Sequence, residues 1–424
     1  MNMFSFLVKL FPYNRSITGN GVRQTLDAIL KEIPIKKTSM QSDTKVFDWT
    51  IPEEWNVEVA QIYDPDGNLL VDFKDNNLFL MGYSTAFKGE LTLNELKKHI
   101  ITDEKKPDWI PYSTSYYKDF WAFCLPYNFV KNMKKGLYKV EINSNKKNGE
   151  LVYAEAYIDN KARKDVLISS YICHPSMAND SLSGVVLAVQ LYKELKKEKN
   201  LNYNYRFLFT PETIGTICFL HNNRKKIKSN LEYGLVATCV GDSGAFTYKK
   251  SRNEKSNINR IAEYIFSNNN ISGNVVEFSP LGSDERQYCS PGFDLDVGVL
   301  TRSMYGKFPE YHTSADNLDF VSEKNLKESL NTYLDIIRAY EANCVFSRTI
   351  PFCEPQMGRY DLYRVVGGAG KDSLDLLTQK HMWILNYADG ETDLLTISKK
   401  SGFDLLDLKK ASDNLVEVDL IIKK

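Results

Sequence analysis

Long hydrophobic runs are absent from this sequence of 424 residues. No stretch approaches the roughly 18 apolar residues of a membrane span, and the apolar stretch before Lys9 is too short for a signal peptide. Net charge is absent too, because 54 Lys and Arg residues balance 54 Asp and Glu residues. The chain therefore has no overall electrostatic potential that would attract it to nucleic acid or to a membrane surface. We expect a soluble, cytoplasmic protein without membrane contact.

Cysteines with the paired spacing of a disulfide framework are also missing. The seven cysteines are an odd number, and several stand in apolar or motif-like settings, so reduced thiols are expected. What the chain does have is 43% hydrophobic and 12% aromatic residues, enough at this length for a large core and two or three domains.

Strand-like and helix-like runs alternate between about residues 150 and 345. Short apolar runs typical of buried strands occupy 165–173, 205–210, 234–240, 274–279 and 296–301. Apolar residues recur every three or four positions in 185–197, 258–267 and 324–343. This alternation predicts an α/β fold with a mostly parallel mixed sheet and helices on both faces.

Two other segments differ from this α/β region in composition and in the pattern of their apolar residues. Residues 45–135 are rich in short aromatic and β-branched runs broken by Pro and Gly, which predicts an inserted β-rich domain. Hairpin turns are expected at 64–67 and at Asn148–Gly149. Three helix-like stretches and a final apolar run predict a winged-helix domain over 351–424. The α/β domain would then be discontinuous, with residues 1–44 and 136–350.

The loops after the predicted strands carry residues that could bind a metal or take part in catalysis. In α/β proteins, ligands bind at the sheet edge where such loops lie. His174 and Asp180 stand on one strand-to-helix loop and could converge on a single cation, since zinc takes imidazole nitrogen and carboxylate oxygen. His312 lies on a similar loop before the closing helix. The alternative is that His174 is structural and Asp180 only caps the next helix.

Glu212 follows the strand 205–210, between Pro211 and Gly215, where it could polarise a water. A glutamate in the first turn of a helix is the plainer alternative. Asp284 and Arg286 stand in LGSDERQY, and Arg286 could take a substrate carboxylate. Asp284 could equally be a simple turn residue.

The order of these motifs resembles a known family. His174, then Asp-x-x-Ser-Gly, Glu212, Gly-Ser-Asp and His-Thr-x-x-Asp are similar to the zinc aminopeptidases related to leucyl aminopeptidase, glutaminyl cyclase and glutamate carboxypeptidase. The chain resembles more closely a bacterial aminopeptidase-like family with a β-rich insert and a C-terminal winged helix. This resemblance lies in the segments CHPSMANDSLSG, PETIGT, GSDERQYCSPGFDL and PEYHTSADNL. Members of that family often accompany genes of surface-polysaccharide biosynthesis.

The resemblance implies a role for each matching position. His174, Asp180 and His312 would bind one or two Zn²⁺ ions or another divalent metal, and Glu212 would be the general base. A second acidic ligand is expected beside Glu212, but Thr213 stands there, and Asp242 is an inexact match for the remaining ligand. Asp284 would hold the Glu212 side chain or the substrate amine. Arg286 and Tyr311 complete the expected substrate contacts.

The function predicted from these residues is metal-dependent hydrolysis of an amide next to a free amino group, as in an aminopeptidase-type exopeptidase. The substrate would be a peptide or a small amino-acid derivative. Two alternatives stay open: a cyclase or amidohydrolase acting on an amino sugar or sugar-linked amino acid, and a degenerate regulator or binding protein.

DNA binding is not expected, since residues 351–424 hold 10 Lys and Arg against 12 Asp and Glu. A contact with another protein, or with a second copy, is expected of this segment instead.

Overall fold

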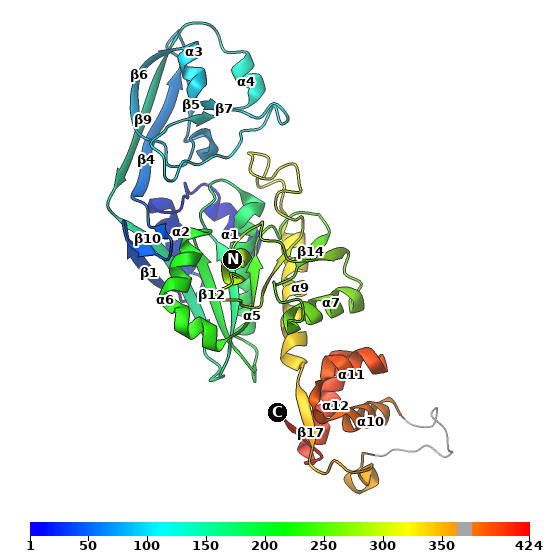
Figure 1. Ribbon diagram of the computed structural model, residues 1–424. Coiled ribbons are helices and arrows are strands. Elements are labelled where there is room, and N and C mark those ends of the chain that lie inside the picture. Colours follow the sequence, from blue (N-terminus) through cyan, green and yellow to red (C-terminus); the bar gives the residue numbers. More distant parts are fainter. Residues whose placement is uncertain (363–374) are drawn as a thin grey trace. The chain divides into compact units, whose positions relative to one another are not determined.

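The structure is a computed structural model that describes residues 1–362 and 375–424. It divides into two compact units, residues 1–259 with 266–333, and residues 260–265 with 334–424 (Figure 1). All seven cysteines are free thiols, as expected. Among the described residues, no helix combines the length and apolar character needed to cross a bilayer.

The first unit is built on an eight-stranded mixed sheet. Its order is β1 (Lys36–Gln41), β10 (Glu150–Ile158), β12 (Asn204–Thr210), β11 (Asp165–Tyr171), β13 (Leu231–Ala237), β16 (Val297–Thr301), β14 (Phe246–Lys249) and β15 (Gly273–Val276). The four central strands β12, β11, β13 and β16 are parallel, whereas β1, β10 and β14 run antiparallel to their inner neighbours. Every residue of β11 and β12 is buried, which explains why apolar residues occur on both faces of these strands.

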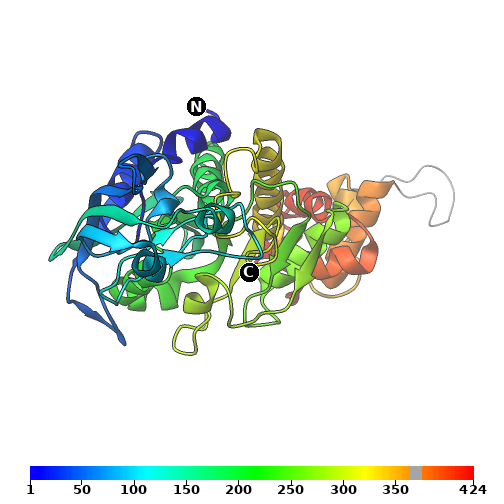
Figure 2. The ribbon, with the colours of Figure 1, turned by 90° about the horizontal axis from the view of Figure 1, so that it is seen from above.

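Helices cover both faces of this sheet. Ser169 bonds to Tyr288 in α8 (Glu285–Tyr288), whereas the next residue, Ser170, faces Gly184 at the start of α5 (Gly184–Leu195). Successive strand residues point to opposite faces, so α5 and α8 lie on opposite sides. Helix α1 (Met3–Leu10, blue in Figure 2) packs on α5, and α6 (Ile214–Asn230) contacts α8. The predicted mixed sheet with two covered faces is confirmed.

The inserted β-rich region forms a second, four-stranded antiparallel sheet. Its order is β5 (Leu69–Asp72), β4 (Glu54–Tyr63), β9 (Leu137–Lys147) and β6 (Phe87–Thr92). The turn expected at residues 64–67 joins β4 to β5, where the Gly67 N–H donates to the carbonyl of Asp64.

The hairpin predicted at Asn148–Gly149 is wrong. The strands on either side of it, β9 and β10, belong to different sheets and do not pair. Gly149 is required there for another reason: a Cβ would lie 2.5 Å from the Cβ of Glu54. The pair marks the point where the chain passes from one sheet to the other.

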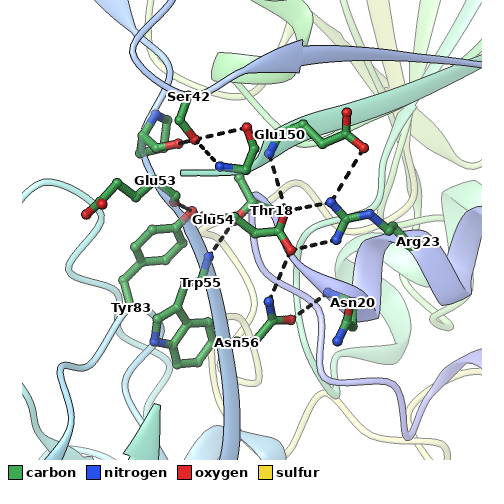
Figure 3. Close-up of polar contacts among 12 residues, drawn as sticks. Thr18, Asn20, Arg23, Ser42, Glu53, Glu54, Trp55, Asn56, Tyr83 and Glu150 are labelled. Carbon is green, nitrogen blue, oxygen red and sulfur yellow. Dashed lines mark hydrogen bonds and ion pairs between the residues drawn. The ribbon is translucent and has the colours of Figure 1, made fainter. Parts of the chain in front are cut away.

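A polar network ties the base of β4 to α2 (Asn20–Leu30) (Figure 3). The Arg23 guanidinium donates to both carboxylate oxygens of Glu54, at 2.7 and 2.5 Å. The Asn56 side chain and the backbone N–H of Glu150 donate to the same carboxylate. Because the Glu54 side chain is only 8% exposed, the bidentate pair is largely shielded from solvent.

Replacing Glu54 with Gln is expected to lower the free energy of unfolding by about 1–3 kcal/mol, because several partly buried donors lose a charged acceptor. The Arg23 hydrogen bond lowers the pKa of Glu54 from its usual 4.5 to about 2. The stabilisation is therefore complete above about pH 4.5 and is lost as the pH falls toward 2. Urea unfolding at several pH values should show the two proteins converging in acid. The control is Asp27→Asn, which removes a pair that Lys37 makes with a 57% exposed carboxylate and should cost far less.

The second unit has helices and strands in the order that is typical of a winged helix. It contains β17 (Val345–Arg348), α10 (Leu376–Tyr387), β18 (Asp389–Asp393), α11 (Leu394–Ser401), α12 (Leu405–Glu417) and β19 (Ile421–Lys423), with the sheet order β18-β17-β19. Each helix begins after an aspartate, Asp375, Asp393 or Asp404, whose side chain accepts a backbone N–H of the first turn. The three predicted helices are confirmed. Residues 363–374 of the predicted domain lie outside the described residues.

Candidate active site

Three predicted ligands meet at the carboxyl edge of the large sheet. His174 follows β11, Asp180 lies in the short segment Ala178–Ser183 before α5, and His312 lies between β16 and α9 (Glu323–Ala342). Each offers a ligand atom within 4.8 Å of the others, and His312 Nε2 lies 3.1 Å from Asp180 Oδ2. The loops after separate strands therefore converge as the sequence indicates.

The chemistry of this cluster fits a cation. Asp180 Oδ2 and His312 Nε2 are buried and have no hydrogen-bond partner, an unfavourable state for two polar atoms that face each other. Burial lowers the pKa of His174 to about 4, so its imidazole is neutral at pH 7 and offers a lone pair. Although burial also raises the pKa of Asp180, the nearby histidines and Tyr171 bring it to about 2, leaving an ionised carboxylate. Two imidazoles and a carboxylate form a three-ligand set that zinc accepts.

A second layer of contacts positions these ligands. The Tyr171 hydroxyl donates to Asp180 Oδ1, and Arg15 Nε donates to the backbone carbonyl of His174 at 2.9 Å. Asp316 accepts the backbone N–H groups of Asn179 at 2.6 Å and Asp180 at 2.9 Å. Sequence reasoning missed all three roles. Asp316 alone carried a signal, because it ends the His-Thr-x-x-Asp motif.

Replacing Asp316 with Asn is expected to weaken metal binding roughly 10–100-fold, the usual effect of losing a group that orients a ligand. The amide has one acceptor where two N–H groups point, so the Asp180 loop loses part of its support. Competition with a chromophoric chelator measures this affinity. The matched control is Asp319→Asn, since Asp319 is exposed in the same loop. Equal affinities for the two variants would contradict this role.

Glu212, the predicted general base, stands beside the cluster. Its Oε2 lies 3.7 Å from His174 Nε2, and its Oε1 accepts a hydrogen bond from Ser283 Oγ at 2.6 Å. Burial, followed by the charges of Asp284 and Asp180, raises the pKa of Glu212. A carboxylate whose pKa is raised toward neutrality can both accept and return a proton.

Thr213 occupies the position where a second acidic ligand was expected, and its backbone is unusual. Its φ of 63° is strained for a β-branched residue. Two contacts hold it: its N–H donates to Asp284 Oδ1 at 2.7 Å, and Arg286 Nη2 donates to its hydroxyl at 3.1 Å. Asp284 thus supports the residue after Glu212, while Ser283 holds the Glu212 side chain itself. Asp284 is fully buried.

A cavity of about 320 Å³ opens onto the cluster. His174, Glu212, Thr213, Arg286 and His312 line it together with an aromatic wall made of Trp49, Tyr112, Tyr116 and Tyr117. The sequence could not assign that wall, because Trp121 and Phe123 have the same character and are buried in the core. Tyr311, a predicted substrate contact, stacks on the His312 ring with centroids 3.9 Å apart.

Asp242 is not brought into the group formed by His174, Asp180 and His312. Its Oδ2 accepts hydrogen bonds from the Asn179 amide and the Ser303 N–H, and its Oδ1 accepts from the Gly244 N–H and the Ser303 hydroxyl. Both oxygens therefore already serve to connect loops.

Comparison with solved structures places the fold. A zinc aminopeptidase from Bacillus subtilis aligns with a TM-score of 0.56 at 11% identity, over 80% of this chain and 94% of its own. An aminopeptidase from Aneurinibacillus aligns with a TM-score of 0.52 at 14% identity, over 79% and 92% of the two chains. The first unit thus has the α/β fold of the zinc aminopeptidases.

The chain belongs to the family described as a domain of unknown function, DUF4910, whose model matches residues 4–343. A winged helix-turn-helix model matches residues 344–423. A Clostridium acetobutylicum protein, named provisionally for polysaccharide biosynthesis and an aminopeptidase-like domain, is 44% identical over 99% of this chain and 95% of its own. A crystal structure from the same organism, provisionally described as a peptidase, aligns at 43% identity with a TM-score of 0.91 over 100% and 96% of the two chains. The resemblance found in the motifs is confirmed.

Proposed function

We propose that this protein is a metal-dependent hydrolase of the aminopeptidase type, which cleaves an amide next to a free amino group. The supporting observation is that His174, Asp180 and His312 offer converging ligand atoms, and that His174 and His312 line the same cavity as Glu212. The aminopeptidase fold agrees with this chemistry, and the metal we propose is a single Zn²⁺ ion. One ion suffices because a three-ligand site leaves a position open.

In the proposed mechanism, His174, Asp180 and His312 would hold the metal, which would supply Lewis-acid chemistry for the scissile carbonyl and the attacking water. Glu212 accepts the proton of that water and later donates it to the leaving nitrogen. Ser283 keeps the Glu212 carboxylate oriented through its hydrogen bond to Oε1. The aromatic wall with Trp49 and Tyr112 excludes bulk water from the reacting groups.

A second candidate is an amidohydrolase or cyclase that acts on a sugar-linked amino acid or an amino sugar. The name of the Clostridium acetobutylicum relative, which refers to polysaccharide biosynthesis, favours such a substrate. Both candidates use the same metal and the same base, and they differ in the group that carries the amide.

An assay with a matched substrate panel tests both candidates. Chelator-treated protein reloaded with Zn²⁺ is compared on aminoacyl amides, their N-acetylated counterparts, glutaminyl peptides and N-acetylated amino sugars. The proposal expects hydrolysis of the aminoacyl amides, loss of that activity with chelator, and little activity on the acetylated forms. Turnover confined to the sugar amides, or cyclisation of the glutaminyl peptides, would support the second candidate. No metal-dependent turnover on the whole panel would contradict both.

A further inference from the structure

The guanidinium of Arg286 lies in the cavity, where its positive charge favours the ionised forms of Glu212 and Asp284 without a direct ion pair among the described residues. Arg286 belongs to α8 and is half-buried. Among the described residues, no carboxylate oxygen lies within 4.0 Å of its nitrogens in any ion pair. Its one hydrogen bond runs from Nη2 to the neutral hydroxyl of Thr213, and its Nε is buried with no partner.

Each of the two carboxylates next to Arg286 in the sequence accepts hydrogen bonds from other groups through one oxygen, and its second oxygen has no hydrogen-bond partner among the described residues. Glu285 is fully buried and accepts hydrogen bonds from Lys249 Nζ at 2.8 Å and from the Tyr305 hydroxyl at 2.7 Å. Asp284 accepts the N–H of Thr213. Lys249 also donates to the carbonyl of Leu281, which fixes the loop before α8. Each acidic neighbour therefore accepts its hydrogen bonds from groups other than Arg286.

A partly buried guanidinium without a direct ion-pair partner is costly, and the ligand that removes this cost best is a carboxylate. Arginine presents its N–H donors as a planar fork that matches the two oxygens of a carboxylate. Among the described residues that line the cavity, Arg286 is the one Lys or Arg side chain, and the others include the aromatic wall. A volume of about 320 Å³ is at the lower end for small-molecule sites, which favours a compact ligand.

We propose that Arg286 binds a free carboxylate on the leaving-amine side of the substrate, so that the substrate class is short, dipeptide-sized amides that end in a carboxylate. This inference rests on the proposed hydrolase function. The two groups lie close together: Arg286 donates a hydrogen bond to the Thr213 hydroxyl, and Thr213 directly follows Glu212 in the chain. A carboxylate held at Arg286 therefore places the neighbouring amide close to the base.

The experiment measures binding without turnover. Metal-free protein carrying Glu212→Gln is titrated with alanyl-alanine and with alanyl-alaninamide, and ligand-observed NMR gives both dissociation constants. We expect the carboxylate form to bind roughly tenfold more tightly, as for a charged hydrogen-bonded pair. Arg286→Gln should abolish this preference, and Arg286→Lys should keep part of it, because lysine retains the charge and lacks the fork.

Arg224→Gln is the matched control. Arg224 is an exposed arginine that lines a neighbouring cavity with Phe47 and Phe293, so its replacement should leave the preference intact. Equal affinity for the two dipeptides in the parent, or a preference that survives in Arg286→Gln and Arg286→Lys alike, would overturn the assignment. If Arg286→Gln does not fold, a preference that is reduced in Arg286→Lys supports the assignment, and an unchanged one overturns it.

The outcomes separate this proposal from the hydrolase proposal. An Arg286-dependent preference in a protein that hydrolyses no amide would keep the carboxylate site and reject the hydrolase. Hydrolysis of dipeptides and of their amides with equal kcat/KM would keep the hydrolase and reject the carboxylate site. An Arg286 that only supports Thr213 would lower the melting temperature on replacement without changing the dipeptide preference.

Discussion

Replacing Glu212 with Gln is expected to lower kcat by roughly 10²–10⁴-fold, the range of general acid–base catalysis, while metal binding stays close to that of the parent. The glutamine side chain has nearly the same size and can still accept the hydrogen bond that Ser283 donates to Oε1. It cannot take a proton from water at neutral pH. Steady-state kinetics on the best aminoacyl amide, combined with metal analysis of the same samples, measures both quantities.

Two further variants make this result specific. Ser283→Ala removes the hydrogen bond that orients Glu212 and should lower kcat much less than Glu212→Gln does, because the carboxylate itself remains. Glu277→Gln changes a carboxylate that is 67% exposed and pairs with Lys250, and it should be neutral. Full activity in Glu212→Gln would reject Glu212 as the base. A large loss of metal in the same variant would instead make Glu212 a ligand.

The central part of the fold could be predicted because its strands are buried on both faces. In β11, β12 and β16 every residue is buried, so the sequence shows short runs that are mostly apolar instead of a strict alternation of apolar and polar residues. Helix α6 gave no such signal. Its first half, Ile214–Leu220, is buried, and much of its second half is exposed, so no single apolar stripe runs along it. The short strand β14 was missed because four residues carry too little periodicity.

The sequence predicted those candidate site residues that lie on loops directly after strands. His174, Asp180, Glu212 and His312 all follow this rule, since strand ends at one sheet edge bring their loops together. The contacts of Arg15 and Tyr171 depend on distant parts of the chain and have no local pattern. The aromatic wall raises the same difficulty. Tyr116 and Tyr117 line the cavity, whereas Trp121, four residues further on, packs in the core.

Replacing either His174 or His312 with Ala is expected to reduce metal affinity by more than about 100-fold, since losing a ligand should exceed the effect of losing its orienting group. With only two of the three ligand groups left, the site no longer has the minimum that catalytic zinc needs. Protein purified without added metal should contain about one metal ion per chain in the parent and almost none in either variant. Elemental analysis and chelator competition measure these values. The control is His221→Ala, an exposed histidine on α6.

Asp242→Asn decides how many metals the site holds. The proposed one-metal site expects the variant to retain about one ion, because Asp242 is outside the ligand group. Stability should fall by about 1–3 kcal/mol, because the new amide group of residue 242 has fewer acceptors for the donors of Asn179, Gly244 and Ser303. A two-metal site expects two ions in the parent and one in the variant. Because Thr213 supplies no carboxylate and both carboxylate oxygens of Asp242 accept hydrogen bonds, the geometry favours a site with one metal ion. A parent protein that contains two ions would reject the one-metal site.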